Sequence, residues 1–168
     1  EIRDNRAERG GALSAHRAVS VIADSEIVNN SASANGGAIQ NSGSYIEGYM
    51  FLMDSSVVRG NQAAGNGGGI CNYATLEIES GTELTENTSG DRGGGVYNTD
   101  RMRVRNASIL DNFAMDGGGI HNSSGEVDVY DSDISDNIAQ ESGGGIVNAG
   151  GGRVTVANTS IENNASQN

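Results

Sequence analysis

Short alternations of apolar and polar residues recur along the chain at intervals far longer than a helical turn. In each one, two apolar side chains stand two positions apart, which is the spacing that places them on the same face of a β-strand. These segments are VSV at 19–21, MFL at 50–52, LEI at 76–78, MRV at 102–104, VDV at 127–129 and VTV at 154–156. Gly, Asn, Asp and Ser flank them, as is typical of short strands bounded by turns. The pattern therefore predicts one strand per segment, with its first and third residues pointing inward.

Two further motifs run in phase with these segments. One is a glycine pair or triplet followed by an aliphatic residue and, in most copies, by Asn two residues later. Its aliphatic residues are Leu13, Ile39, Ile70, Val96, Ile120 and Ile146, at spacings of 26, 31, 26, 24 and 26 residues. The other motif is an aliphatic residue, two other residues and Asn. It occupies residues 2–5, 27–30, 58–61, 84–87, 109–112, 134–137 and 161–164. A fixed order of motifs with such a period indicates a repeat architecture.

No strand of this kind carries enough apolar surface to be buried alone, so the repeats have to stack on one another. Stacking pairs each strand in parallel with its equivalent one turn further on, about 4.8 Å away. We predict that residues 1–168 form a single all-β domain, a right-handed parallel β-helix of about six coils of roughly 26 residues. Three short strands per coil would close a triangular tube. At the glycine corner any side chain would meet the coils above and below, so glycine there is a requirement of stacking.

The asparagines of the two motifs are predicted to form ladders along the tube. Stacked amides hydrogen-bond to their copies in neighbouring coils and also pair with backbone groups of the turns. The first predicted ladder contains Asn5, Asn30, Asn61, Asn87, Asn112, Asn137 and Asn164. The second contains Asn41, Asn72, Asn98, Asn122 and Asn148.

The middle residues of the alternating segments should form an outward column. Its predicted members are Ser20, Phe51, Glu77, Arg103, Asp128 and Thr155. Acidic and basic residues alternate over Glu77, Arg103 and Asp128, as parallel stacking in register would select, because like charges directly opposite one another are destabilising.

Composition narrows the class of partner. The chain has 22 Asp and Glu residues against 10 basic residues, all of them Arg, and a net charge of −12. Nucleic acid and anionic membranes would meet like charge, so we expect no nucleic-acid partner. No apolar run approaches the length of a membrane helix, so we expect no membrane insertion by this segment. The single cysteine, Cys71, excludes an internal disulfide.

The glycine motif GGA[ILV], paired with [FIL]xxN, resembles the repeats of chlamydial polymorphic outer-membrane protein passengers. It also resembles bacterial and archaeal surface proteins with right-handed parallel β-helices of the pectin-lyase-like class. The resemblance covers residues 2–164, although Ile, Val or Leu stands where the chlamydial repeats usually have Phe. It implies an extracellular or cell-surface module, structural or adhesive and without catalytic activity, such as a stalk, passenger or filament component. Because related β-helices cleave acidic polysaccharides, the alternative is a polysaccharide-active enzyme or a carbohydrate-binding module.

One outward column is acidic. It precedes the Asn of the first ladder and brings Glu86, Asp111 and Asp136 onto successive coils. Stacked carboxylates suit Ca²⁺, which prefers oxygen ligands, and mutual repulsion raises carboxylate pKa values, as a catalytic acid requires. A solvated acidic face explains the column as well, because carboxylates are commonly exposed. We assign no catalytic residue and expect no cofactor, with Ca²⁺ as the one candidate.

A second column contains Cys71, Tyr97 and His121 on consecutive coils. Cys71 and His121 would be about 10 Å apart, which is too far for a thiolate–imidazole pair. We therefore expect a mixed column that faces solvent.

The longest spacing between glycine motifs falls at SGSYIEGYMFLMD, residues 42–54. Tyr45, Tyr49 and Phe51 gather there on an otherwise polar tube, so they are candidates for contact with neighbouring copies, other surface proteins or a polysaccharide. Alternatively, the insertion covers a gap in the wall. The sequence begins and ends within a coil and has no capping element, so we expect a fragment of a longer protein or a unit continued by neighbours.

Overall fold

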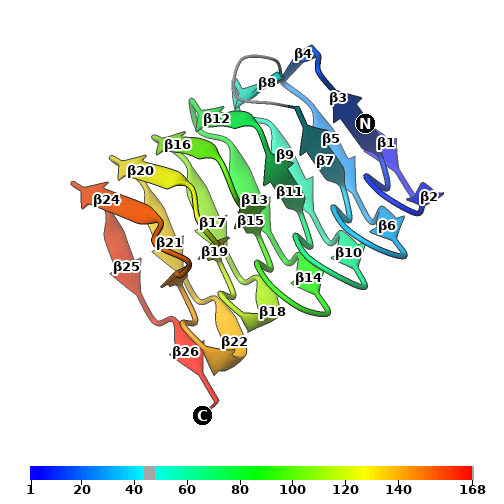
Figure 1. Cartoon of the computed structure of the whole chain (residues 1–168). Coiled ribbons are helices and arrows are strands. Elements are labelled where there is room, and N and C mark those ends of the chain that lie inside the picture. Colours follow the sequence, from blue (N-terminus) through cyan, green and yellow to red (C-terminus); the bar gives the residue numbers. More distant parts are fainter. Residues whose placement is uncertain (44–47, 168) are drawn as a thin grey trace.

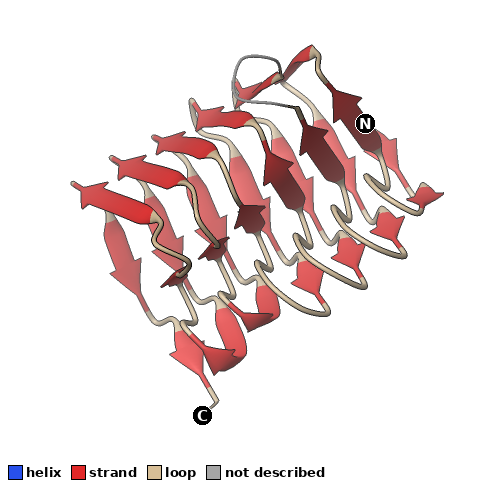
Figure 2. Cartoon of the chain, viewed as in Figure 1, coloured by secondary structure: helices blue, strands red, loops and turns tan. Residues whose placement is uncertain are grey.

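The computed structural model describes residues 1–43 and 48–167, and these residues form parallel β-strands joined by turns. The strands stack as successive coils along one axis, with the two termini at opposite ends (Figure 1). No helix is drawn in the described part of the chain (Figure 2). That part therefore contains no helix that could cross a membrane. The predicted all-β parallel β-helix is confirmed.

Each coil contributes one strand to each of four parallel sheets, which we name after their first strands. The β1 sheet contains β1 (Ile2–Arg3), β5 (Glu26–Val28), β9 (Val57–Arg59), β13 (Glu83–Thr85), β17 (Ser108–Leu110), β21 (Asp133–Ser135) and β25 (Ser160–Glu162). The β2 sheet contains β2 (Arg6–Ala7), β6 (Ser31–Ala32), β10 (Gln62–Ala63), β14 (Thr88–Ser89), β18 (Phe113–Asp116), β22 (Ile138–Ser142) and β26 (Ala165–Ser166). The β3 sheet contains β3 (Leu13–His16), β7 (Ile39–Ser42), β11 (Ile70–Tyr73), β15 (Val96–Asn98), β19 (Ile120–Asn122) and β23 (Ile146–Asn148). The β4 sheet contains β4 (Val19–Ala23), β8 (Tyr49–Met53), β12 (Thr75–Glu79), β16 (Arg101–Arg105), β20 (Glu126–Tyr130) and β24 (Arg153–Ala157).

The prediction of three strands per coil is wrong, because the β2 sheet adds a fourth. Five of its seven strands are two residues long, and the side chains that the sheet buries are small, such as Ala32, Ala63 and Ser89. One small inward residue produces no alternation of large apolar and polar positions, so the sequence pattern does not reveal the strand.

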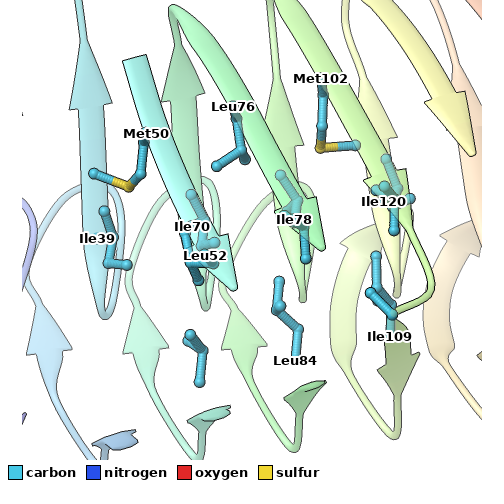
Figure 3. Packing of buried hydrophobic residues seen from close by; sticks show 14 of the residues in the cluster. Ile39, Met50, Leu52, Ile70, Leu76, Ile78, Leu84, Met102, Ile109 and Ile120 are labelled. Carbon is cyan, nitrogen blue, oxygen red and sulfur yellow. The ribbon is translucent and has the colours of Figure 1, made fainter. Parts of the chain in front are cut away.

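The core is a continuous column of aliphatic side chains from the β1, β3 and β4 sheets, each stacked on its equivalent in the next coil (Figure 3). Its largest fully buried members are Ile27, Ile39, Met50, Leu52, Ile70, Leu76, Ile78, Leu84, Met102, Ile109, Ile120 and Ile134. Burial of each such side chain stabilises the fold by about 1.5–3 kcal/mol relative to exposure. The motifs therefore supply the interior of the tube, as their periodicity predicts.

The first coil departs from the predicted register by one residue. Ser20 pairs with Met50 and Ile22 with Leu52, so Ser20 and Ile22 point inward. Val19 and Val21 point outward and are 72% and 62% exposed. The outward column of Phe51 therefore begins at Val21, and its prediction from Ser20 is wrong. The strand VSVIA places Val19 and Val21 on one face and Ser20 and Ile22 on the other, and a one-residue shift exchanges the two faces. The structure buries the face of Ile22, which is 9% exposed.

Glycine at the corner serves two purposes. Gly93 has a φ of +68°, a left-handed conformation that residues with a Cβ atom rarely adopt. Gly94 lies so close to the next coil that an added Cβ would be 2.3 Å from the carbonyl oxygen of Gly118. The corner thus needs one glycine for its turn and another for the spacing between coils.

Both predicted asparagine ladders are present. Along the first, each Nδ2 donates to the Oδ1 of the equivalent Asn in the next coil, at 2.9–3.0 Å from Asn5 to Asn164. The same Oδ1 atoms also accept a bond from the backbone N–H of the preceding rung. The second ladder runs from Asn41 to Asn148 with Nδ2–Oδ1 distances of 2.7–2.9 Å.

The second ladder lacks a rung in the first coil, where Ala15 pairs with Asn41. The buried Oδ1 of Asn41 consequently has no hydrogen-bond partner among the described residues. Ala15→Asn is expected to raise the free energy of unfolding by about 1 kcal/mol, because its Nδ2 would donate to that oxygen. Urea denaturation measures the change. Ala15→Leu, which adds volume without a donor, is the control, and an equal gain from both variants would contradict the hydrogen-bond explanation.

Candidate functional site

The outer face of the β4 sheet is the candidate site. Strand alternation turns the first, third and fifth residue of each strand outward, which gives three columns parallel to the axis. The first column is Val19, Tyr49, Thr75, Arg101, Glu126 and Arg153. The second is Val21, Phe51, Glu77, Arg103, Asp128 and Thr155. The third is Ala23, Met53, Glu79, Arg105, Tyr130 and Ala157.

One end of this face is apolar. β4 and β8 contribute only aliphatic, aromatic and Met side chains to the three columns, and Tyr49 is 42% exposed. The rings of Tyr49 and Phe51 lie nearly parallel, with centroids 6.1 Å apart and an interplanar angle of 13°. Two parallel rings beside exposed valines form an apolar platform on a tube whose surface is mostly polar.

The other end is a network of alternating charges. Arg101 Nη2 lies 3.1 Å from Glu126 Oε2, and Arg153 Nη2 lies 3.4 Å from Glu126 Oε1. In the next column, Arg103 Nη1 lies 3.6 Å from Glu77 Oε1. Exposed ion pairs of this kind contribute about 0–1 kcal/mol each, so the network adds little stability. It presents both signs of charge in a fixed pattern.

A hollow of about 440 Å³ connects the two ends along the corner between the β3 and β4 sheets. It is lined by Tyr49, Thr75, Thr99, Asp100, Arg101, Ser124, Gly125 and Glu126. Its side chains offer hydroxyl, carboxylate and guanidinium groups, which suit polar contacts with a bound partner. Neither His nor Cys is among these lining residues. The hollow therefore offers no thiolate–imidazole pair.

The aromatic candidates from the sequence are placed as follows. Tyr49 and Phe51 lie together on the outer face of the β4 sheet, as the apolar insertion suggested. Tyr45 lies outside the described residues.

The acidic column has a backbone explanation. Glu86, Asp111 and Asp136 are exposed and have φ values of +57°, +53° and +56°. The same corner in the other coils is occupied by Asp4, Asn29, Gly60 and Asn163, again with positive φ. Gly, Asn and Asp adopt this left-handed conformation more readily than other residues. The left-handed turn therefore explains the Asp, Asn and Gly residues of this column without a metal ion.

Metal binding by the side chains of the acidic column would need them to gather around one point. Across residues 1–43 and 48–167, no three or more His, Cys, Asp and Glu side chains lie where they could hold a metal ion together. Glu86, Asp111 and Asp136 lie on separate coils and form no such group.

The column of Cys71, Tyr97 and His121 does not face solvent, and that prediction is wrong. The exposed fractions of these residues are 0%, 8% and 4%. The side chains project from the outside of the β3 sheet but pack against the glycine corner. For instance, a Cβ added to Gly117 would lie 2.9 Å from His121 Cβ. Burial lowers the pKa of His121, with the nearby Arg92 guanidinium adding to the effect. The strand pattern does not predict the burial of these outward side chains, because the residues that cover them belong to the neighbouring glycine turn.

Burial also makes Cys71 inert. It raises the pKa of the Cys71 thiol to about 12, so almost no thiolate is present at neutral pH. We expect an aromatic disulfide reagent at about pH 8 to leave the folded protein unmodified, because thiolate and access are both required. The absorbance of the released thiol measures the reaction, and the protein unfolded in urea, which should release one equivalent, is the control. Equal rates for folded and unfolded protein would contradict the burial.

The coil pattern has a counterpart among known protein families. Residues 24–42 and 55–73 each match the Chlamydia polymorphic membrane protein (Chlamydia_PMP) repeat. Two segments of the chain are thus similar to the polymorphic membrane protein repeat. Each matched segment includes one strand of the β1, β2 and β3 sheets and one rung of each ladder, so the repeat is the part of a coil around the glycine corner. Comparison with curated proteins and with solved structures gave no significant match.

The two matches to the polymorphic membrane protein repeat cover strands of the β1, β2 and β3 sheets and none of the β4 sheet. Both matched segments end at or just after the β3-sheet strands, before β8 and β12 begin. The outer face of the β4 sheet thus belongs to the portion of each coil that these two matches do not cover.

Proposed function

We propose that the chain is a structural and adhesive module of a cell-surface protein, which holds the outer face of the β4 sheet against another surface protein. The polymorphic membrane protein repeat supports the cell-surface location. The observation that carries the adhesive role is the apolar platform of Val19, Val21, Tyr49 and Phe51, which adjoins the charged network on one sheet face. Contiguous exposed apolar area bordered by polar residues is characteristic of interaction sites.

The scaffold supports this role because it is repetitive and internally bonded. Two ladders and four parallel sheets link each coil to the next, so the platform keeps its shape without a partner. A preformed surface avoids part of the entropic cost of ordering side chains and loops on binding. Stiffness and exposure are the properties that a stalk or an adhesin requires.

Adhesion of coated beads tests the proposal. Beads carrying the chain are applied to cell layers and counted after washing, and a triple variant, Val19→Ser, Val21→Ser and Tyr49→Ser, is compared with the wild type. We expect the variant to lose most of the adhesion because the platform is removed. Ile138→Ser, which replaces an exposed aliphatic side chain on the β2 sheet, is the matched control. Unchanged adhesion by the triple variant, or none by the wild type, would contradict the proposal.

The proposed module performs no reaction. The enzymatic alternative depends on the column of Glu86, Asp111 and Asp136, and the left-handed corners explain these positions without catalysis. Incubation with acidic polysaccharides, with and without Ca²⁺, is expected to yield neither unsaturated nor new reducing-end products. Turnover of any polysaccharide would overturn the non-catalytic part of the proposal while leaving the adhesion assay to decide the rest.

A further inference from the structure

The side chain of His121 is buried on the outside of the β3 sheet, where it packs against a second ring. Its exposed fraction is 4%, and it is stacked on Tyr97 of β15 with centroids 5.6 Å apart and an interplanar angle of 20°. Tyr97 in turn meets the ring of Tyr73 edge to face, with centroids 6.2 Å apart. The glycine corner closes the site, because a Cβ added to Gly117 would lie 2.9 Å from His121 Cβ. The imidazole is therefore held as the last member of a row of three rings.

This position suits a neutral imidazole and not an imidazolium. The Nδ1 of His121 is buried and has no hydrogen-bond partner among the described residues. A protonated imidazole donates from both ring nitrogens, so protonation would place a charged N–H group where no described group accepts its hydrogen bond. Burial accordingly lowers the pKa of His121, and the Arg92 guanidinium adds to the effect. The stack thus selects the neutral form of the ring.

The charged and titratable groups that face His121 come from β15, from the turn before it and from the end of β18. Arg92 in the turn opposes protonation by like charge, whereas the carboxylates of Asp116 and Asp91 favour it. Arg92 Nε lies 3.7 Å from Asp91 Oδ1 and 4.0 Å from Asp116 Oδ2. Tyr97 contributes the stacked ring of β15. Asp116 is the more loosely paired of the two carboxylates, so it can accept another cation.

A hollow beside the ring offers it a second position. The hollow has a volume of about 350 Å³ and is lined by Arg92, Asp116, His121, Ser123, Ser142, Val147, Ala149 and Gly150. Val147, the residue that pairs with His121 in the following coil, carries no titratable group. The Asp116 side chain is 24% exposed, so water reaches its carboxylate. An imidazolium in this hollow would be hydrated and would have a carboxylate to which it can donate a charge-assisted hydrogen bond.

We propose that His121 is a pH-dependent switch, in which the neutral ring stays stacked on Tyr97 and the protonated ring moves into the hollow and donates to the Asp116 carboxylate. The ring takes its proton from the solvent. The imidazolium replaces Arg92 as the partner of Asp116, and Arg92 keeps Asp91. In the acid form the face of Tyr97 that the imidazole covered is exposed. The switch lies on another sheet than the platform, so it goes beyond the adhesive role and does not depend on it.

The direction of the pH dependence follows from the form that binds the proton more tightly. A histidine in water has a pKa of about 6.5, and burial lowers the pKa of His121 in the stack. The stacked form is therefore fully favoured above about pH 6.5 and loses its advantage as the pH falls from there toward the lowered pKa of the stacked ring. Over this range the ratio of the hollow form to the stacked form rises by up to about ten-fold per pH unit, because one proton separates the two forms.

NMR spectroscopy follows the ring directly in His16→Gln, which leaves His121 as the single histidine of the chain. At about pH 8 we expect nuclear Overhauser effects between the ring protons of His121 and Tyr97, because the neutral rings are stacked. Titration to about pH 4 should abolish these contacts as the imidazole becomes protonated, while far-UV circular dichroism stays constant. Retention of the contacts by the protonated ring would overturn the proposal. So would a ring that stays neutral throughout, or unfolding of the whole chain at the pH of protonation.

Two variants test the second position of the ring. Val147→Phe fills part of the hollow, and the corner has room for it because the adjacent Gly143 has no Cβ, which would lie 2.5 Å from Val147 Cγ2. We expect its midpoint to fall by about one pH unit or more, a ten-fold weaker proton uptake. Asp116→Asn keeps the shape and removes the charge of the acceptor, so its midpoint should fall by about half a pH unit. Ile138→Ser, on the β2 sheet, should titrate like the parent protein.

An unchanged midpoint in both folded variants would overturn the proposal, and Asp116→Asn decides alone if Val147→Phe does not fold. His121→Phe gives an independent measurement, because its ring can stack on Tyr97 but cannot bind a proton. Urea denaturation at several pH values between about 7.5 and 5 should show the unfolding equilibrium constant of the wild type rising on acidification relative to that of His121→Phe, by up to about ten-fold per pH unit. Equal pH dependence of the two proteins would show that the stack does not disfavour the protonated ring, and the switch would be excluded.

Discussion

Gly94→Ala is expected to lower the free energy of unfolding by about 4 kcal/mol or more, which is among the largest effects of a single substitution. The added Cβ would lie 2.3 Å from Gly118 O, 2.6 Å from Phe113 O and 2.7 Å from Phe113 N. All three contacts are with backbone, which cannot turn aside as a side chain can. Relief requires neighbouring coils to separate, and this would break hydrogen bonds such as that from Gly94 N to Gly117 O at 3.1 Å.

Urea denaturation followed by circular dichroism measures this loss. Gly151→Asn is the control, because Gly151 has a φ of +80° and an added Cβ would find nothing within 4 Å. Asn tolerates the left-handed conformation, so the control should change stability by no more than about 1 kcal/mol. A loss below about 1 kcal/mol for Gly94→Ala would show that the glycines do not set the distance between coils.

Asn87→Ala is expected to cost about 3 kcal/mol, because it removes the central rung of the first ladder and leaves buried polar groups without partners. Asn87 Nδ2 donates to Val58 O at 2.9 Å and to Asn112 Oδ1 at 3.0 Å. Its Oδ1 accepts bonds from both the backbone N–H and the Nδ2 of Asn61 at 3.0 Å. An alanine side chain can make none of these hydrogen bonds. Water cannot replace them, because position 87 is fully buried.

The matched control for Asn87→Ala is Asn5→Ala, at the exposed end of the same ladder. Asn5 also donates to the next rung, Asn30 Oδ1, but water can replace a lost partner there. Its substitution should cost less than about 1 kcal/mol. Chemical denaturation of both variants gives the comparison, and equal losses would mean that burial of the ladder does not determine its contribution.

Much of this architecture could be predicted from periodicity. Side chains that repeat at the same place in every coil, such as Ile70 in the core or Asn87 in the ladder, leave a regular pattern in the sequence. The fourth strand was missed because it buries only small residues such as Ala63. The register of the first coil was missed because Val19 and Val21 form the apolar pair of the pattern, whereas the structure buries the opposite face, which carries Ser20 and Ile22.

The candidate sites were less predictable, since they depend on contacts between different parts of a coil. Tyr49 was found because an aromatic residue on a polar repeat is conspicuous. The column of Glu86 was interpreted as a possible site because its residues were considered only as carboxylates. The recurrence of Asp, Asn and Gly at the same corner is instead the sequence signal of its left-handed backbone. Burial of His121 depends on the shape of the Gly117 turn and had no sequence signal of its own.

The strand pairings join each coil only to the one before and the one after it. Such a chain behaves as a linear series of like units, whose total stability is the sum of their own contributions and those of the junctions between them. Duplication or loss of one complete unit would preserve every remaining junction of the same type. Variation in length by whole units is therefore far less disruptive to this molecule than an insertion or deletion of a few residues within a unit.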